Sequence, residues 1–174
     1  MRLTARDGSD VPPGEVGHIV VRTPDLMVGY WNDTLQTHRV LRDGWLDTGD
    51  LARADEDGYL WFVGRDKDMI ARGGAKVAPA MVEEALAAHP AVASAAVVGV
   101  SDPRYGQLPF AFYGLRPGSA DPGAEGLRAW AAARLDAPSV PAGFAAIGRW
   151  PVTDQGKLDR SRLQWMAEAG GREV

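Results

Sequence analysis

The sequence predicts an α+β fold, in which a small β-rich part is followed by a compact α/β part. Residues 1 to about 63 form short β-rich runs separated by turn residues, whereas helical and strand patterns alternate from Gly64 onward. The chain has 174 residues, 45% of them hydrophobic and 24% charged. That is enough for one ordinary domain or two small ones with a buried core.

The first part contains a strand at 17–22 and a helix between Asp33 and Leu41, with Asp33 as its N-cap. Residues 44–53 mix turn and strand residues, so that Asp50 follows a Thr-Gly turn. Residues 55–58 predict a hairpin turn before a further strand. This part is too small and too open to hold a core alone.

The second part begins with a tight hairpin, because Gly73-Gly74 lies between the β-prone segments 69–72 and 76–77. A helix then starts near Pro79 and ends before Pro90. Further along, the pattern predicts two strands, a helix, a short strand and a last helix capped by Asp159, at 95–100, 110–115, 122–135, 144–147 and 159–169.

The composition excludes several classes of protein. The formal net charge of -4 argues against nucleic-acid binding, which requires a basic face. There is no cysteine, and the three histidines lack the spacing of metal ligands, so no metal site is predicted. No apolar run approaches the roughly 20 residues of a membrane span, and the N-terminus lacks a signal-peptide core. We therefore expect no membrane partner and a cytoplasmic protein.

Three charged residues on turns form the candidate site. Asp50 offers a carboxylate that accepts hydrogen bonds, Arg65 a rigid fork of donors, and Lys157 a mobile point charge beside Gly156. Such a set suits a nucleotide and its developing phosphate charge. Each residue alone also has a structural interpretation, as a turn cap, a surface arginine and a loop lysine respectively.

Five ordered motifs occupy residues 43–52, 57–70, 73–79, 102–106 and 151–160. They resemble those of the adenylate-forming superfamily, which includes acyl-CoA synthetases, peptide-synthetase adenylation domains and beetle luciferases. The resemblance covers nearly the whole chain and is closest to the acyl-CoA synthetase branch.

The resemblance implies a domain organisation. Residues 1–66 look like the last, β-barrel subdomain of the family's large N-terminal domain, and residues 67–174 like its mobile C-terminal domain. Lys67 stands at the family's hinge position, where a solvated charge suits a rotating backbone. The phosphate loop, the acyl pocket and the rest of the large domain have no counterpart in this sequence.

The resemblance also implies roles for the site residues. Asp50 would hold the ribose hydroxyls of ATP and of the acyl-AMP, and Arg65 the ribose or a phosphate. Lys157 would be catalytic, bridging the carboxylate and the α-phosphate during adenylation. Gly73 and Gly74 would line a pantetheine tunnel. ATP or AMP, Mg²⁺, and CoA or a phosphopantetheine acceptor are then expected, once the missing part is supplied.

Some positions depart from the family pattern. Met81 stands where glutamate is usual, Gln107 replaces a common glutamate, and Ala75 replaces a polar residue of the hairpin. The segment 138–144 lacks a typical motif of the family. These changes put the thioester-forming conformation and the acceptor in question. Met81 has a second interpretation, as a packing substitution on a helix.

Three functional hypotheses follow. The chain supplies the C-terminal part of an acyl-adenylate and thioester forming ligase, works with a separate N-terminal polypeptide and is inactive alone. Alternatively, it is a non-catalytic module that binds a carrier protein or pantetheine group, or that forms a homodimer. Thirdly, it is an expressed fragment or relic. Trp31, Trp45 and Trp61 lie near an exposed partner surface or pack in the core.

Overall fold

The computed structural model describes residues 1–170. It divides into two compact units, Met1–Asp68 and Met69–Val174, and each unit has a five-stranded sheet of its own. The sequence-based boundary between residues 66 and 67 lies two residues before this division. The last four residues of the predicted second domain lie outside the described part.

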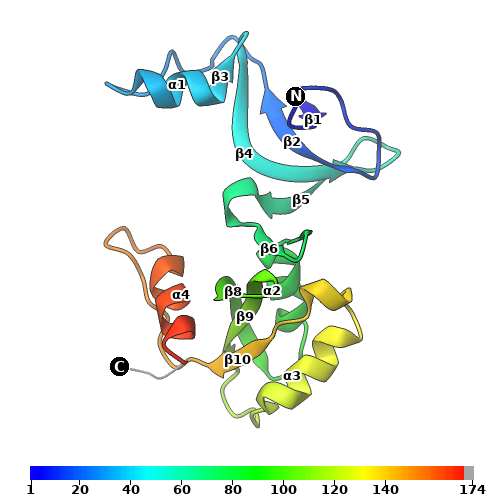
Figure 1. Ribbon diagram of the computed structural model, residues 1–174, viewed down its shortest axis with the longest axis vertical. Coiled ribbons are helices and arrows are strands. Elements are labelled where there is room, and N and C mark those ends of the chain that lie inside the picture. The colour runs from blue at the N-terminus through cyan, green and yellow to red at the C-terminus, as the bar shows by residue number, and fades with distance from the viewer. Residues whose placement is uncertain (171–174) are drawn as a thin grey trace. The chain divides into compact units, whose positions relative to one another are not determined.

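The sheet of the first unit is curled around its longest strand, β4 (Trp45–Ala54). Strands follow the order β1-β2-β4-β3, and β5 also pairs with β4. The remaining bounds are β1 (Arg2–Thr4), β2 (Val16–Val21), β3 (Leu41–Arg42) and β5 (Leu60–Arg65). Figure 1 shows the strong bend of β4, which gives a half-barrel where the resemblance implies a β-barrel subdomain.

Local sequence signals predicted most of the helices and strands of this unit. Helix α1 (Thr34–Val40) has Asp33 as its N-cap, whose side chain accepts from the backbone N–H of Gln36. Residues 45–53 differ from the prediction, because β4 continues through them and Gly49, at φ +74°, forms a bulge instead of a turn. The short strands β1 and β3 were not predicted.

The first unit has little core and many exposed apolar side chains. Its buried hydrophobic residues are Leu51, Ala52 and Val63. Trp31 is 98% exposed, Trp61 is 57% exposed and Trp45 is half-buried beside Arg2. Core packing was therefore the wrong interpretation for Trp31 and Trp61, and the expectation of an open, core-poor part is met.

The second unit is built around β9 (Gly106–Leu115), which pairs antiparallel with β8 (Val92–Asp102) and parallel with β10 (Gly143–Ala146). The hairpin of β6 (Ile70–Arg72) and β7 (Ala75–Val77) joins β9 through the pair Arg72 and Gly106. The helices are α2 (Pro79–Ala87), α3 (Gly123–Ala132) and α4 (Arg160–Glu168).

Alternating side chains of β8 and β9 build two separate hydrophobic clusters, one on each face of this sheet. On one face Val97 and Ala111 join Leu86 of α2 and Leu127 of α3. On the other face the neighbouring strand residues pack against α4, in the cluster Ala96, Val98, Phe112, Ile147, Leu163 and Ala167. Figure 1 shows α4 apart from α2 and α3. This confirms the layered α/β expectation.

Helix termini in the second unit follow the sequence signals. Pro79 occupies the first turn of α2, and Asp159 caps α4 by accepting from the backbone N–H of Arg162. Met81 lies on α2 but is 50% exposed and belongs to neither cluster, so it is not a packing substitution. Over residues 1–170, no helix has the length and apolar character needed to cross a bilayer.

Candidate functional site

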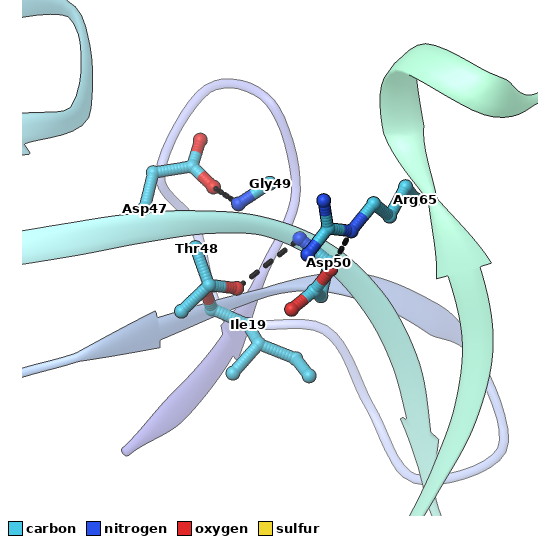
Figure 2. A network of polar contacts seen from close by, with 6 residues as sticks. All are labelled: Ile19, Asp47, Thr48, Gly49, Asp50 and Arg65. Atoms are coloured by element: carbon cyan, nitrogen blue, oxygen red, sulfur yellow. Dashed lines mark hydrogen bonds and ion pairs between the residues drawn. The ribbon is translucent and has the colours of Figure 1, made fainter. Parts of the chain in front are cut away.

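Asp50 and Arg65 form an ion pair across two neighbouring strands of the first unit. They are register partners in β4 and β5, and the Nε of Arg65 donates to Oδ1 of Asp50 over 3.0 Å. Figure 2 shows both side chains on the same side of the sheet. The structure therefore brings together two residues that the sequence separates by 15 positions.

The bulge in β4 determines where the Asp50 carboxylate points. Residues 48–50 stand opposite the single residue Ile19 of β2, and the hydroxyl of Thr48 donates to the Ile19 carbonyl over 3.0 Å. Thr48 Oγ1 also accepts from the backbone N–H of Asp50 over 3.1 Å, and Asp47 accepts from Gly49 over 2.9 Å (Figure 2). These bonds fix the backbone without using the Asp50 carboxylate.

The pair keeps polar atoms that could bind a ligand. The side chains of Asp50 and Arg65 are 28% and 56% exposed. Within residues 1–170, the Asp50 Oδ2 and the terminal nitrogens of Arg65 make no hydrogen bond. A carboxylate oxygen can accept from ribose hydroxyls and a guanidinium can donate to oxyanions. The residues present therefore fit the ribose and phosphate chemistry of ATP or AMP.

Lys157 lies on a short ordered loop of the second unit. The loop is closed by the bridge between Val152 and Leu158, by the backbone bond from Thr153 to the Lys157 carbonyl (2.8 Å) and by the Thr153 hydroxyl, which accepts from the Lys157 N–H. Gly156 has φ +75°, a conformation that favours glycine. The Lys157 side chain is exposed, so a fixed backbone carries a mobile ammonium.

Lys67 lies in the 3₁₀ turn η1 (Asp66–Asp68), one residue before the last residue of the first unit. Its side chain is exposed. The hinge role stays a prediction, because a single conformation does not test a rotation.

Gly73 and Gly74 form the turn of the β6–β7 hairpin, with φ +55° and +89°. They differ in their surroundings. A Cβ on Gly73 would lie 3.1 Å from Cδ1 of Tyr105, whereas nothing lies within 4 Å of one on Gly74. The hairpin interpretation of these glycines is confirmed, and the tunnel role stays a prediction.

Two contacts explain departures from the family pattern. Gln107 Oε1 accepts from the backbone N–H of Ala71 over 3.0 Å, so the amide supplies the hairpin with the acceptor that a glutamate would offer. The unusual segment before Lys157 includes the 3₁₀ turn η2 (Ala137–Ser139), whose carbonyls accept from Arg72.

The second unit contains an ionic clamp that was not predicted from the sequence. Glu83 of α2 and Arg160 of α4 form a two-pronged pair with distances of 2.9 and 3.2 Å. Both also bind the backbone of Val97 in β8, Glu83 by accepting its N–H and Arg160 by donating to its carbonyl. The only signal in the sequence was Glu83 itself, a glutamate that the family pattern also has two residues after the position of Met81.

A cavity of about 560 Å³ lies elsewhere in the first unit, lined by residues that include Arg2, His18 and Trp45. Neither Asp50 nor Arg65 lines it, so the polar geometry, and not this cavity, defines the candidate site. No group of three or more histidine, aspartate or glutamate side chains suited to a metal ion occurs within residues 1–170.

Comparison with known proteins extends these observations. Residues 81–157 match the family of AMP-binding enzyme C-terminal domains. The chain is 45% identical over 164 residues to a feruloyl-CoA synthase of Amycolatopsis sp., covering 94% of this chain and 33% of that protein. It is 40% identical to a 2-succinylbenzoate–CoA ligase of Geobacillus kaustophilus, covering 91% and 32% respectively. The chain thus spans about a third of the length of these relatives.

Solved structures agree. The amide bond synthetase McbA from Marinactinospora thermotolerans superposes with a TM-score of 0.89 at 38% identity, over 95% of this chain and 33% of that one. The o-succinylbenzoate CoA synthetase from Bacillus subtilis, in complex with its acyl-adenylate intermediate, gives 0.84 at 35% identity, over 94% and 33%. The chain belongs to the adenylate-forming superfamily and corresponds to the C-terminal part of its acyl-CoA ligases.

Proposed function

We propose that this chain supplies the C-terminal part of an AMP-forming acid–thiol ligase. The observation that carries the proposal is the exposed Asp50–Arg65 pair, whose free oxygen and nitrogens suit a nucleotide. It occurs in a chain 45% identical to the matching third of a feruloyl-CoA synthase. An exposed ammonium on an ordered loop, at Lys157, supports the same chemistry.

Each residue has a defined role in this proposal. Asp50 accepts from ribose hydroxyls, and Arg65 donates to the ribose or a phosphate while orienting Asp50. Lys157 acts on the negative charge that builds up as the acid's carboxylate attacks the α-phosphate. A cation placed there stabilises the transition state more than the ground state. Mg²⁺ would accompany ATP, and this chain offers it no ligand set within residues 1–170.

Activity requires further protein. The relatives are about three times as long, and the first unit exposes apolar side chains that a missing neighbour would cover. These exposed apolar side chains include Val28, Trp31, Leu35, Tyr59 and Phe62. We therefore propose an N-terminal adenylation polypeptide as the partner. Alone, the chain would have no measurable ligase activity, because a catalytic unit that lacks members loses nearly all its rate.

The same exposed surface supports a second candidate function. Trp31 and Val28 are each 98% exposed, a degree of exposure typical of an interaction site for a carrier protein or a second copy of the chain. Under this alternative the chain binds but does no chemistry. Binding would then survive loss of Lys157.

A chimeric ligase tests the proposal. The last third of the feruloyl-CoA synthase is replaced by this chain, and acid-dependent ATP–pyrophosphate exchange is measured with ferulate, 2-succinylbenzoate and a medium-chain fatty acid. The proposal predicts exchange with the acid preferred by the N-terminal part. A chimera that folds and binds ATP without exchange would contradict it and favour the interaction module.

The acceptor is tested in the same chimera. Since the relatives include CoA ligases and the structural neighbours an amide bond synthetase, CoA, a carrier-protein thiol and a simple amine are supplied separately after adenylation. We propose CoA or a phosphopantetheine thiol, as the sequence resemblance implies.

A further inference from the structure

Arg72 links the glycine hairpin to a segment more than 60 residues away. It is the last residue of β6, directly before Gly73, and is half-buried. Its Nη1 lies 3.2, 2.6 and 3.2 Å from the carbonyl oxygens of Ala137, Pro138 and Val140. One guanidinium nitrogen thus contacts two carbonyls of the η2 turn and one carbonyl that follows it.

Other contacts hold the same hairpin from a second side. The backbone N–H of Gly73 donates to the carbonyl of Tyr105 over 2.8 Å, and that of Ala71 donates to Gln107 Oε1 over 3.0 Å. The Arg72 guanidinium lies 5.7 Å from the centre of the Tyr105 ring, within the range of a cation–π contact. The β8–β9 turn and the η2 turn therefore both contact the hairpin and hold it in place.

The hairpin needs such anchors. Its two strands have three residues each and meet at two adjacent glycines. A two-stranded hairpin is only marginally stable alone, and glycine allows many backbone conformations. The end of the hairpin away from the turn is held by the buried side chains of Ile70 and Val77. Near the turn, the register pair of Arg72 with Gly106 and the backbone bond of Gly73 tie it to the sheet side. The side-chain anchors therefore act on the conformation of the turn.

We propose that Arg72 is a positioning residue that fixes the Gly73–Gly74 hairpin for transfer of the acyl group to the acceptor thiol. This inference rests on the proposed function. In that step the thiol sulfur bonds to the acyl carbon, the bond from that carbon to the phosphate oxygen breaks, AMP leaves with the electron pair, and the thiol proton passes to solvent. Arg72 touches none of these atoms and acts only by holding the hairpin.

Hydrogen exchange of the full chain tests the positioning itself. In Arg72→Met, the backbone N–H groups of Ala71 and Gly73 should exchange at least about tenfold faster, because their anchored conformation is lost. Arg134→Met is the matched control. Arg134 also donates to a backbone carbonyl, that of Trp130, over 3.2 Å, and its guanidinium lies 3.4 Å from the centre of the Trp130 ring. Unchanged exchange at the hairpin in Arg72→Met would overturn the proposal.

The chimeric ligase tests the consequence for catalysis. Arg72→Met should leave pyrophosphate exchange within about twofold of wild type and raise the KM for the thiol, measured from preformed adenylate, about ten- to a hundredfold. Arg72→Lys keeps a cation and should recover part of this loss. Gln107→Leu removes the other side-chain anchor and should also raise the KM for the thiol. This variant takes the place of Arg72→Met in the test if Arg72→Met does not fold.

The outcomes separate the two claims. A wild-type chimera without pyrophosphate exchange contradicts the proposed function, and the hairpin assignment is then decided by hydrogen exchange alone. A wild-type chimera that forms the thioester, with Arg72→Met and Gln107→Leu variants of unchanged thiol KM, overturns the role of Arg72. Equal losses in both half-reactions would show a general folding defect and would overturn it as well.

Discussion

At the scale of single residues, side-chain partners decide which groups are available to a ligand. The Nε of Arg65 donates to Asp50. Within residues 1–170, the two terminal nitrogens of Arg65 and the second carboxylate oxygen of Asp50 make no hydrogen bond. Thr48 and Asp47 satisfy the backbone of the bulge in their place. The candidate site is therefore ordered by contacts within the first unit.

Asp50→Asn should weaken nucleotide binding in the chimeric ligase. The amide keeps the size of the side chain but loses a charge-assisted acceptor, a loss of about 1.5–3 kcal/mol, or roughly ten- to a hundredfold in the KM for ATP. Steady-state exchange at varied ATP measures it. Asp10→Asn is the control, since Asp10 is also paired with an arginine, Arg2, over 2.8 Å. Equal effects of both substitutions would contradict the role of Asp50.

Tyr113 predicts an alkaline loss of stability. Burial, together with the hydrogen bond from its hydroxyl to Asp121, raises the pKa of Tyr113 from 10.0 to about 12. The native state therefore holds this proton between pH 10 and 12 after the unfolded chain has released it. Stability is unaffected below pH 10 and falls by roughly 2 kcal/mol as pH rises through that window.

Denaturant unfolding at pH 9 and at pH 11.5 checks this prediction. Tyr113→Phe should be less stable at pH 9 by about 1 kcal/mol, through the lost hydrogen bond, and should lose less stability on going to pH 11.5. Tyr59→Phe, at a position 71% exposed, should behave as wild type. An identical alkaline loss in Tyr113→Phe would assign it to other groups.

At the scale of elements, local signals predicted most helices and strands but not the contacts between them. Asp33, Pro79 and Asp159 act within one turn of their own position, so their capping roles were visible in the sequence. Gly49 was taken for a turn because a positive φ suits both a turn and a bulge, and only pairing with β2 distinguishes them.

Long-range partners were the part that sequence reasoning could not reach. Arg65 was predicted as a nucleotide ligand, but its pairing with Asp50 depends on the β4–β5 register. Arg160 lies 77 residues from Glu83, and its role depends on α2 and α4 meeting at β8. No periodicity encodes such a meeting, so the ionic clamp emerges only in the folded unit.

Glu83→Gln should destabilise the second unit. Glutamine would place an N–H₂ donor against the guanidinium of Arg160, which is also a donor. Arg160 would then lack its charge partner at the point where α2, α4 and β8 meet. Breaking a buried pair costs about 3–5 kcal/mol, and partial exposure of both side chains, 19% and 38%, reduces this to about 2 kcal/mol. Denaturant unfolding measures the change. Glu84→Gln, an exposed neighbour on α2, should be near neutral, and equal effects would contradict the clamp.

At the scale of the whole molecule, burial is divided unequally between the two units. Both hydrophobic clusters belong to the second unit, whereas the first buries few apolar side chains. We infer that the first unit depends on further protein for much of its stability. This agrees with relatives about three times as long.

The chain should therefore unfold in two steps. Hydrogen exchange during a denaturant series should show the β2 and β4 amides of the first unit opening first, and the β8 and β9 amides of the second unit opening last. Trp61 should report the first step, since its Nε1 donates to Asp55 over 2.9 Å within the first unit. One transition shared by all amides would contradict the prediction.

The central claim is that this chain contributes the C-terminal part of an adenylating site, with Lys157 as its catalytic cation. Pyrophosphate exchange by the chimeric ligase with Lys157→Ala tests it most directly, with Arg149→Ala, an exposed cation of the same unit, as the control. We predict that Lys157→Ala lowers exchange about a hundredfold or more, through loss of one electrostatic contact, while Arg149→Ala retains it. Exchange undiminished by Lys157→Ala in an otherwise active chimera would contradict the account.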